Sequence, residues 1–231
     1  MPRVKYFSKT NEQLPGVTSI CDRFSDKSGL TEWKLWMVRQ GKDPNLESKH
    51  SMNVGTLAHA IIDKDIGDAP PIPTAQDMFL SSYEYEACMK EAEIAKHGFS
   101  AWVTREKPEF VATEVSLVSD EKRFGGTFDA LCIIDGKLTV VDWKTSAKIY
   151  PQYETQVAAY AFLLGWGRLN AEQSTPHPHG VPHIGQLPEQ FGILRLDKKT
   201  GKYEWRVHGH KKLFEEVSRF LRWRDVFDLT V

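Results

Sequence analysis

Apolar positions recur at helical spacing through the first hundred residues of the chain. The repeat within residues 30–39 predicts one helix, with Thr31 as its N-cap because a hydroxyl there can accept a backbone N–H. A second helix is predicted to begin near Gly55. A longer one covers about residues 74–97 and is closed by Gly98, a typical C-cap residue. The N-terminal part is therefore predicted to be helical.

Strand-like alternation of apolar and polar positions replaces this pattern after residue 110. Asp135-Gly136 is a strong tight-turn signal, so the strands on either side of it should form an antiparallel hairpin. The predicted elements are strands at 110–119, 122–134 and 138–145, a helix at 153–164, a long loop at 165–190, a hairpin of strands at 191–196 and 203–207, and a helix at 211–227.

The order of these elements predicts the fold class. Helices, three strands, a helix, two strands and a helix indicate an α/β protein whose mixed sheet is flanked by helices. Residues 1–105 form a predicted helical N-terminal region that packs on a core of residues 106–231. The length of 231 residues allows both parts to belong to one compact domain.

Composition excludes several classes of protein. Hydrophobic residues make up 41% of the chain and charged residues 26%, which excludes global disorder. No apolar run approaches the roughly 20 residues that span a bilayer, and the N-terminal segment lacks the apolar centre of a signal peptide. We therefore expect a soluble protein with no membrane partner, in the cytoplasm of a bacterial or phage-infected cell, with a mitochondrial location left open.

The three cysteines limit the cofactors that the chain can bind. Cys21, Cys88 and Cys132 are far apart in the sequence and form no C-x-x-C pair. Neither a disulfide framework nor a four-cysteine iron–sulfur cluster can be built from them alone. We expect three thiols in a reducing compartment and no iron–sulfur cluster.

The net charge of −1 is not typical of a nonspecific nucleic-acid-binding protein. Local clustering of charge matters more than the total, because carboxylates that bind a metal offset basic residues elsewhere. The densest basic stretches are Lys211-Lys212 and residues 219–224. A solvated helix face and a contact with DNA would each explain these stretches.

Two predicted neighbouring strands carry a set of residues suited to phosphodiester chemistry. Asp142 and Lys144 alternate with Val141 and Trp143, so the first two should point to one face of the sheet. Asp129 lies on the partner strand of the same hairpin. Two carboxylates on adjacent strands can converge on Mg²⁺ or Mn²⁺, and a nearby lysine can neutralise a phosphate or position the attacking water.

A surface salt bridge on an edge strand is the alternative for this D-x-K pattern. Taken alone, the pattern favours neither explanation. The context of the pattern favours a catalytic role. An apolar strand leads into Asp142, a strand with Gly126 and Asp129 pairs with that strand, and a helix follows.

Four motifs and an N-terminal segment stand in a distinctive order within about residues 14–165. They are Pro15-Gly-Val-Thr-Ser19, Gly55-Thr-Leu-Ala-His59, Gly126-Thr-Phe-Asp129, Asp142-Trp-Lys144-Thr145 and Gln156-x-x-x-Tyr160. Together they resemble the motifs of RecB-like nucleases in the PD-(D/E)XK superfamily. Because it has no four-cysteine set, the chain is similar to the cluster-free exonucleases of phages and mitochondria rather than to members with an iron–sulfur cluster. The resemblance implies a restriction-endonuclease-like mixed sheet with an N-terminal helical extension.

The resemblance also implies roles for residues at the predicted metal site. Asp129 and Asp142 would bind the metal, the backbone carbonyl of Trp143 would add a ligand, and Lys144 would be catalytic. His59 matches an additional metal ligand of the family, with a hydrogen-bonded helix histidine as the alternative. Glu114 matches an acidic strand residue of less defined role, with a surface-facing glutamate as the alternative.

Four further residues are implied to contact DNA. Gln156 and Tyr160 lie four positions apart and so share one helix face, which in the family lies beside the active site and contacts DNA or metal-bound water. Thr145 and Ser146 follow the lysine at the end of the strand, where hydroxyls or amides can hold a phosphate. In the helical extension, Trp33, Trp36, Tyr83 and Trp102 are candidates for stacking on bases.

The resulting hypothesis is a Mg²⁺- or Mn²⁺-dependent deoxyribonuclease, an exonuclease on single-stranded DNA ends or flaps. DNA would be its partner, in recombination, repair or replication, together with a recombination or replication protein. Two alternatives remain open at this point: a noncatalytic DNA-binding or assembly subunit that keeps the fold, and a restriction-type endonuclease.

Overall fold

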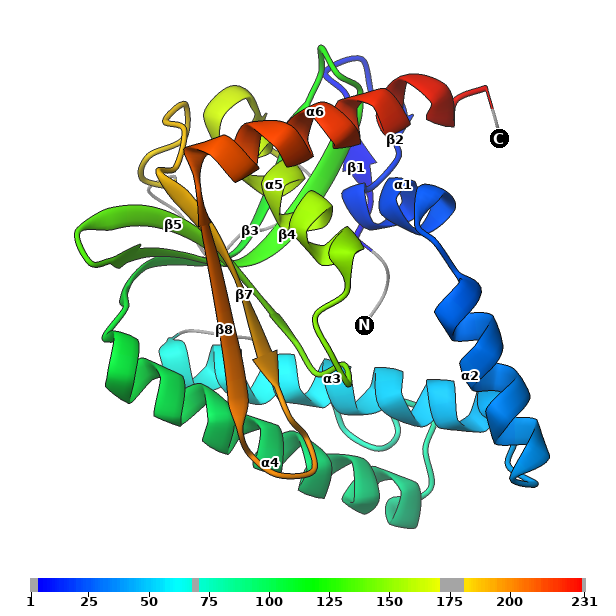
Figure 1. Cartoon of the computed structure of the whole chain (residues 1–231). Coiled ribbons are helices and arrows are strands. Elements are labelled where there is room, and N and C mark those ends of the chain that lie inside the picture. Colours follow the sequence, from blue (N-terminus) through cyan, green and yellow to red (C-terminus); the bar gives the residue numbers. More distant parts are fainter. Residues whose placement is uncertain (1–3, 68–70, 171–180, 230–231) are drawn as a thin grey trace.

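The computed structural model describes residues 4–67, 71–170 and 181–229 (Figure 1). A six-stranded sheet with the order β6-β3-β4-β5-β7-β8 forms the centre, and all neighbouring strands are antiparallel except β5 and β7. This confirms the predicted mixed sheet flanked by helices. The strands are β3 (Glu109–Ser119), β4 (Phe124–Ile134), β5 (Lys137–Lys144), β6 (Arg168–Leu169), β7 (Gln190–Leu196) and β8 (Tyr203–Gly209).

A helical crossover makes β5 and β7 parallel. Parallel neighbours need a connection of a dozen or more residues, and α5 (Pro151–Trp166) supplies it. α5 begins with a proline, whose fixed φ suits the first helical turn. The predicted loop at 165–190 is wrong in part, because β6 lies within it and pairs with β3. Residues 171–180 of that loop lie outside the described residues.

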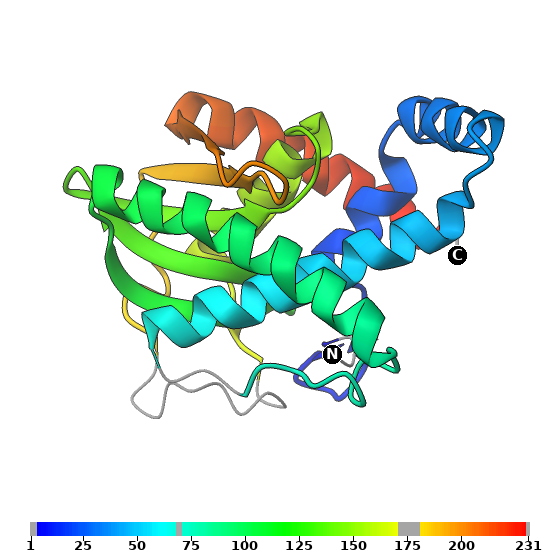
Figure 2. The same ribbon diagram turned by 90° about the horizontal axis from the view of Figure 1, so that it is seen from below.

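Two layers of helices bury the two faces of the sheet (Figures 1 and 2). α3 (Pro44–Ile66) and α4 (Ser82–Glu106) cover one face, where Trp102 and Trp143 are fully buried in the same cluster. α1 (Val17–Phe24), α5 and α6 (His210–Phe227) cover the other face. α2 (Ser28–Arg39) connects the two layers at the edge of the molecule and buries only Met37.

The starts of two helices differ from the prediction. α2 begins at Ser28 after Lys27, so Thr31 is not its N-cap, and the Thr31 hydroxyl instead donates to the Lys27 carbonyl at 3.1 Å. α3 begins at Pro44, eleven residues before the predicted start, because the Asp43 side chain accepts the Asn45 N–H at 2.8 Å. This cap precedes the apolar repeat from which the helix was predicted.

Gly98 does not end a helix, as predicted, but lies inside α4. The helix begins at Ser82 with a capping box between Ser81 and Glu84, and it ends at Glu106. A Cβ atom at position 98 would lie 3.1 Å from the carbonyl oxygens of Gly201 and Lys202 in the β7–β8 turn. The glycine therefore lets the hairpin approach the helix closely.

The N-terminal region is not purely helical. β1 (Tyr6–Phe7) and β2 (Gln13–Leu14) form a two-stranded ribbon, and strands of two residues are too short to give a periodic signal. The division of the chain near residue 105 stays a prediction. No helix within residues 4–67, 71–170 and 181–229 combines the length and apolar composition that a bilayer span requires.

Candidate metal centre

Three acidic residues lie in one row across neighbouring strands. Glu114 of β3 stands opposite Asp129 of β4, since the pairs on either side of it join Thr113 to Ala130 and Val115 to Phe128. On the other side, the pairing of β4 with β5 ends at Ala130 and Val141. Asp129 and Asp142 are therefore the first residues beyond the paired region, where the two strands separate.

Two donors hold the Asp129 carboxylate at this fork. Its Oδ2 accepts the backbone N–H of Trp143 at 2.7 Å, and its Oδ1 lies 3.2 Å from His59 Nδ1. Asp129 is only 6% exposed. The carboxylate thus accepts the Trp143 N–H in place of a main-chain oxygen of β4. His59 approaches the same carboxylate from α3. The Trp143 ring packs into the core under α3 and α4.

Asp142 and Lys144 form a buried ion pair on β5. The Lys144 ammonium contacts Asp142 Oδ2 and lies 5.3 Å from the ring centre of Tyr153 on α5. Burial raises the pKa of Asp142 to about 6 against the opposing influence of Lys144. Burial alone would lower the pKa of Lys144, but the charges of Asp142 and Asp129 outweigh it and raise that pKa. The lysine is therefore a fixed positive charge beside the carboxylates.

Glu114 lies in an irregular part of β3. Its φ of +50° is left-handed, a conformation that costs energy for a residue with a Cβ atom. Ala112 and Val115 pack in the same cluster although they are an odd number of positions apart, so the alternation is interrupted between them. Burial raises the pKa of Glu114 to about 8, with a further contribution from the charge of Asp129.

His59, Glu114 and Asp129 can share one metal ion. One ligand atom from each lies within 4.8 Å of the other two, among the described residues. Desolvation opposes a charge on His59, but the charge of Asp129 and its hydrogen bond raise the pKa of the imidazole to about 9. Carboxylate oxygens are suitable ligands for Mg²⁺ or Mn²⁺, and an imidazole nitrogen is a common ligand of divalent transition metals. The side chains present thus fit a divalent cation.

Gly55 allows α3 to approach the end of β5. A Cβ atom at this position would lie 3.3 Å from Thr145 Oγ1, closer than ordinary contact. Gly55 precedes His59 by one helical turn, so the same helix face meets Thr145 and Asp129. The G-x-x-x-H spacing therefore has a packing reason as well as a chemical one.

The four predicted DNA-contacting residues lie around Lys144 and on α5. Thr145 and Ser146 are half-buried after β5, and the Ser146 hydroxyl donates to the Lys148 carbonyl at 2.9 Å. Gln156 Nε2 donates to the Tyr160 hydroxyl oxygen at 2.8 Å. Gln156 is 7% exposed and Tyr160 is 3% exposed. Their contact with DNA stays a prediction.

Two glycines of β4 make room for aromatic rings. A Cβ atom on Gly126 would lie 2.6 Å from the Tyr160 ring, and one on Gly125 would lie 2.3 Å from Tyr6. The Tyr160 pKa is raised, mainly by burial and further by the charge of Asp142. Gly126 therefore lets α5 approach β4 closely, three positions before Asp129.

Replacing Gly126 by alanine is expected to move Tyr160 away from β4 and lower the free energy of unfolding by about 1–3 kcal/mol, as overpacking does. Chemical denaturation measures this change. Gly29→Ala is the matched control, because Gly29 on α2 has open space at its Cβ position. It should leave stability unchanged or raise it by at most about 1 kcal/mol. Wild-type stability of Gly126→Ala would show that the close approach is not required.

A comparison with known families identifies this arrangement. The sequence model described as the PD-(D/E)XK nuclease superfamily matches residues 31–223. The chain belongs to the PD-(D/E)XK nuclease superfamily. Members of this superfamily use divalent metal ions, in agreement with the His59, Glu114 and Asp129 cluster. The fold is accordingly the restriction-endonuclease-like α/β fold that the sequence motifs implied.

Solved structures give more distant similarities. An alkaline exonuclease from Laribacter hongkongensis is 15% identical with a TM-score of 0.34. The match covers 58% of this chain and 66% of that chain, which is slightly less than two thirds of its length. The same exonuclease in complex with dAMP is 14% identical with a TM-score of 0.36, over 77% and 86%. The protein SSO0001 is 11% identical with a TM-score of 0.33, over 77% and 75%. No curated protein matches the sequence.

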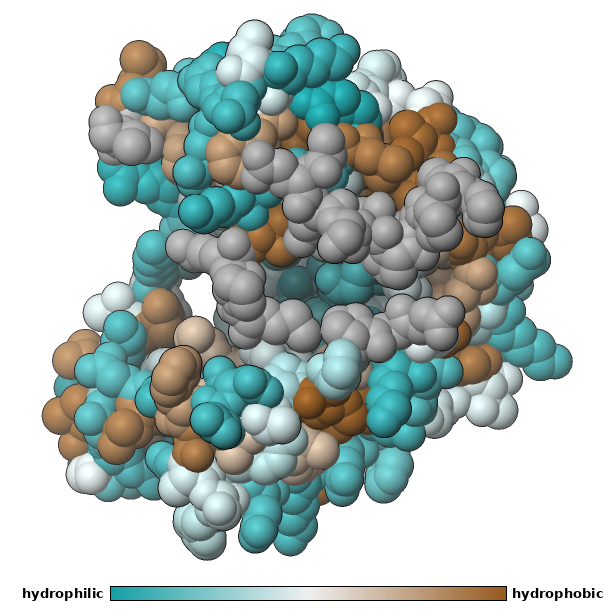
Figure 3. All heavy atoms as spheres, turned by 180° about the vertical axis from the view of Figure 1, so that it is seen from behind, coloured by the Kyte–Doolittle hydropathy of each residue, from teal (hydrophilic) through white to brown (hydrophobic). Residues whose placement is uncertain are grey.

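The surface of this PD-(D/E)XK protein is hollowed between its two helical layers. Figure 3 shows the hollow from behind, with hydrophilic residues inside it. Of the candidate stacking residues, Trp36 is 52% and Tyr83 81% exposed, whereas Trp33 is half-buried. Trp102 is fully buried against Phe99 and Trp205, so its predicted role in stacking on bases is wrong.

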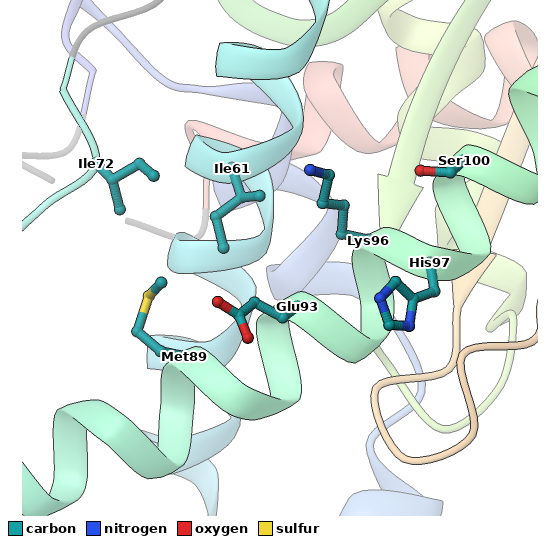
Figure 4. A pocket seen from close by; sticks show the side chains of 7 residues that line it. All are labelled: Ile61, Ile72, Met89, Glu93, Lys96, His97 and Ser100. Carbon is teal, nitrogen blue, oxygen red and sulfur yellow. The ribbon is translucent and has the colours of Figure 1, made fainter.

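A separate pocket of about 400 Å³ lies between α3 and α4 (Figure 4). Its lining includes Ile61 of α3 and Glu93 and Lys96 of α4. Ile61 is two residues from His59, which corresponds to about 200° around the helix. The pocket therefore lies on the other side of α3 from the metal centre and is not part of it.

Two residues of the centre did not belong to any sequence motif. Tyr153 lies beside Lys144, and no spacing rule connects these two positions before β5 and α5 have packed. Asp63 follows His59 by four residues, which places both on one face of α3. That spacing is a signal from which Asp63 could have been identified.

Proposed function

We propose that this PD-(D/E)XK protein is a Mg²⁺- or Mn²⁺-dependent deoxyribonuclease that acts as an exonuclease on single-stranded DNA ends or flaps. The observation that carries the proposal is the partly buried site in which His59, Glu114 and Asp129 meet the Asp142–Lys144 pair. Family membership supports nuclease chemistry, and the combination of carboxylates with a lysine supports hydrolysis of a phosphodiester.

Each residue has a proposed role in this reaction. His59, Asp129, Asp142 and the Trp143 carbonyl would hold the metal, with Glu114 as a further ligand, and the metal would polarise the phosphate and lower the pKa of a water molecule. Lys144 neutralises charge that develops on the scissile phosphate and positions the attacking water. Its contact with Asp142 and the Tyr153 ring keeps the ammonium in place.

The remaining residues are proposed to position DNA. Thr145 and Ser146 hold a phosphate next to the scissile bond, using hydroxyls at the end of β5. Gln156 and Tyr160 support the site from α5, through their mutual hydrogen bond and the packing of Tyr160 on Gly126. The exposed ring of Trp36 on α2 is available to stack on an unpaired base beyond the site.

Cleavage of labelled DNA tests the proposal. Linear single-stranded DNA labelled at the 5′ or 3′ end and a circular control are incubated with Mg²⁺, Mn²⁺ or EDTA. We expect loss of the linear strand only with metal, and the label lost first gives the polarity. Asp142→Asn should reduce the rate about 100-fold or more. Asp225→Asn, which changes an exposed carboxylate on α6, should leave it unchanged.

Three results would contradict the proposal in different ways. Equal degradation of linear and circular DNA would replace the exonuclease by an endonuclease, and discrete fragments from a long duplex would indicate a restriction-type enzyme. DNA binding without cleavage in any metal would indicate a noncatalytic subunit. Circular dichroism of Asp142→Asn establishes that a loss of activity does not come from unfolding.

A further inference from the structure

Asp63 is a buried carboxylate with an unpaired oxygen. It is 7% exposed, and its Oδ1 atom has no hydrogen-bond partner among the described residues. The neighbouring acidic residue on the same helix, Asp65, is instead exposed and pairs with Lys96 at 2.7 Å. Burying an unpaired carboxylate is costly, so the buried Asp63 side chain on α3 calls for a partner.

The surroundings of Asp63 are those of the metal centre. It lies one helical turn after His59, on the face of α3 that meets Asp129. Burial raises the pKa of Asp63 to about 7, and the charge of Asp129 adds to this effect while His59 opposes it. The charge of Asp63 in turn contributes to the raised pKa of Glu114. The carboxylates of this site outnumber its one lysine, whose ammonium contacts Asp142.

The geometry separates Asp63 from the direct ligands. His59, Glu114 and Asp129 form a group whose ligand atoms all lie within 4.8 Å of one another, and Asp63 does not belong to that group. Asp63 lies on α3 and, unlike Asp142, is not part of the fork between β4 and β5, so a contact with the cation through water fits its position better than direct binding. A water molecule bound to the cation can bridge the remaining distance. It donates hydrogen bonds, and an ionised Asp63 carboxylate can only accept them.

We propose that Asp63 is a positioning residue of the metal centre, which accepts hydrogen bonds from water bound to the cation held by His59, Glu114 and Asp129. This inference rests on the proposed metal-dependent function. Carboxylates next to the direct ligands orient them and strengthen metal binding, and their loss typically weakens binding about 10- to 100-fold. Asp63 supplies such an acceptor from the same helix that supplies His59.

Mn²⁺ binding without DNA tests the role of Asp63. Titration followed by electron paramagnetic resonance gives the Kd for wild type, Asp63→Asn and Asp65→Asn. We expect Asp63→Asn to raise the Kd about 10- to 100-fold and Asp65→Asn to leave it unchanged. In EDTA, Asp63→Asn should have a Tm equal to or above that of wild type, because an unpaired buried charge is removed. The increase in Tm caused by Mn²⁺ should be smaller.

Two results would overturn the assignment. One is a Kd for Asp63→Asn within twofold of wild type, and the other is a lower Tm in EDTA with unchanged Mn²⁺ affinity, which would indicate a purely structural role. Failure of the proposed nuclease function gives a different result, since wild type would then bind Mn²⁺ without cleaving DNA. The comparison of Asp63→Asn with wild type would still decide the role of Asp63.

Discussion

Replacing Asp129 by asparagine is expected to abolish measurable Mn²⁺ binding and to lower the cleavage rate at least about 1,000-fold. The Asp129 carboxylate is central to the site, because it contacts both His59 and the Trp143 amide and can share a metal with Glu114. Asparagine keeps the shape but not the charge. A bound metal contributes several kcal/mol to the transition state, and each 1.4 kcal/mol corresponds to a tenfold change in rate.

A matched variant separates this effect from a general loss of charge on the hairpin. Asp135 lies in the exposed turn between β4 and β5 with a φ of +50°, a conformation that asparagine also tolerates. Asp135→Asn should therefore bind Mn²⁺ and cleave DNA like wild type. Metal titration and initial rates measure both proteins. Wild-type Mn²⁺ affinity in Asp129→Asn would rule out this carboxylate as a ligand.

Replacing Lys144 by methionine is expected to lower the cleavage rate about 100- to 1,000-fold while Mn²⁺ binding is retained. The ammonium supplies a positive charge in a buried position, where removing one group that stabilises developing charge typically has an effect of this size. Methionine has a similar length and no charge. Metal binding should persist or become tighter, because a positive charge next to the carboxylates is removed while all proposed ligands remain.

Lys148 provides the control for this variant. Its ammonium lies 5.2 Å from the ring centre of Tyr150, as that of Lys144 lies 5.3 Å from Tyr153, but Lys148 is exposed. Lys148→Met removes the same charge and a similar ring contact, and it should retain most of the activity. Single-turnover rates at saturating Mn²⁺ compare the two variants. Equal effects in both would mean that Lys144 contributes only general positive charge.

Most of the central sheet was predictable from the sequence, because local patterns determine it. Alternation predicted β3, β4 and β5, and the Asp135-Gly136 turn predicted the β4–β5 hairpin. Alternation also predicted that Asp142 and Lys144 would share a face, and in the structure they contact each other while Val141 and Trp143 pack in the opposite cluster. These features depend on neighbours along the chain, which a single sequence displays.

The sequence by itself thus determined the five longer strands of the sheet, the β4–β5 hairpin and the residue types of the candidate metal centre. The tertiary structure decided how α3 and β3 complete that centre. Asp63 gained its position only when α3 packed over the fork between β4 and β5, and Glu114 turned toward Asp129 through an irregular, left-handed backbone. Gly98 likewise acquired its role from a hairpin a hundred residues later. Contacts between distant segments decided these features. A periodic sequence pattern reports only contacts that recur with each helical turn or at every second residue of a strand, so it does not reveal them.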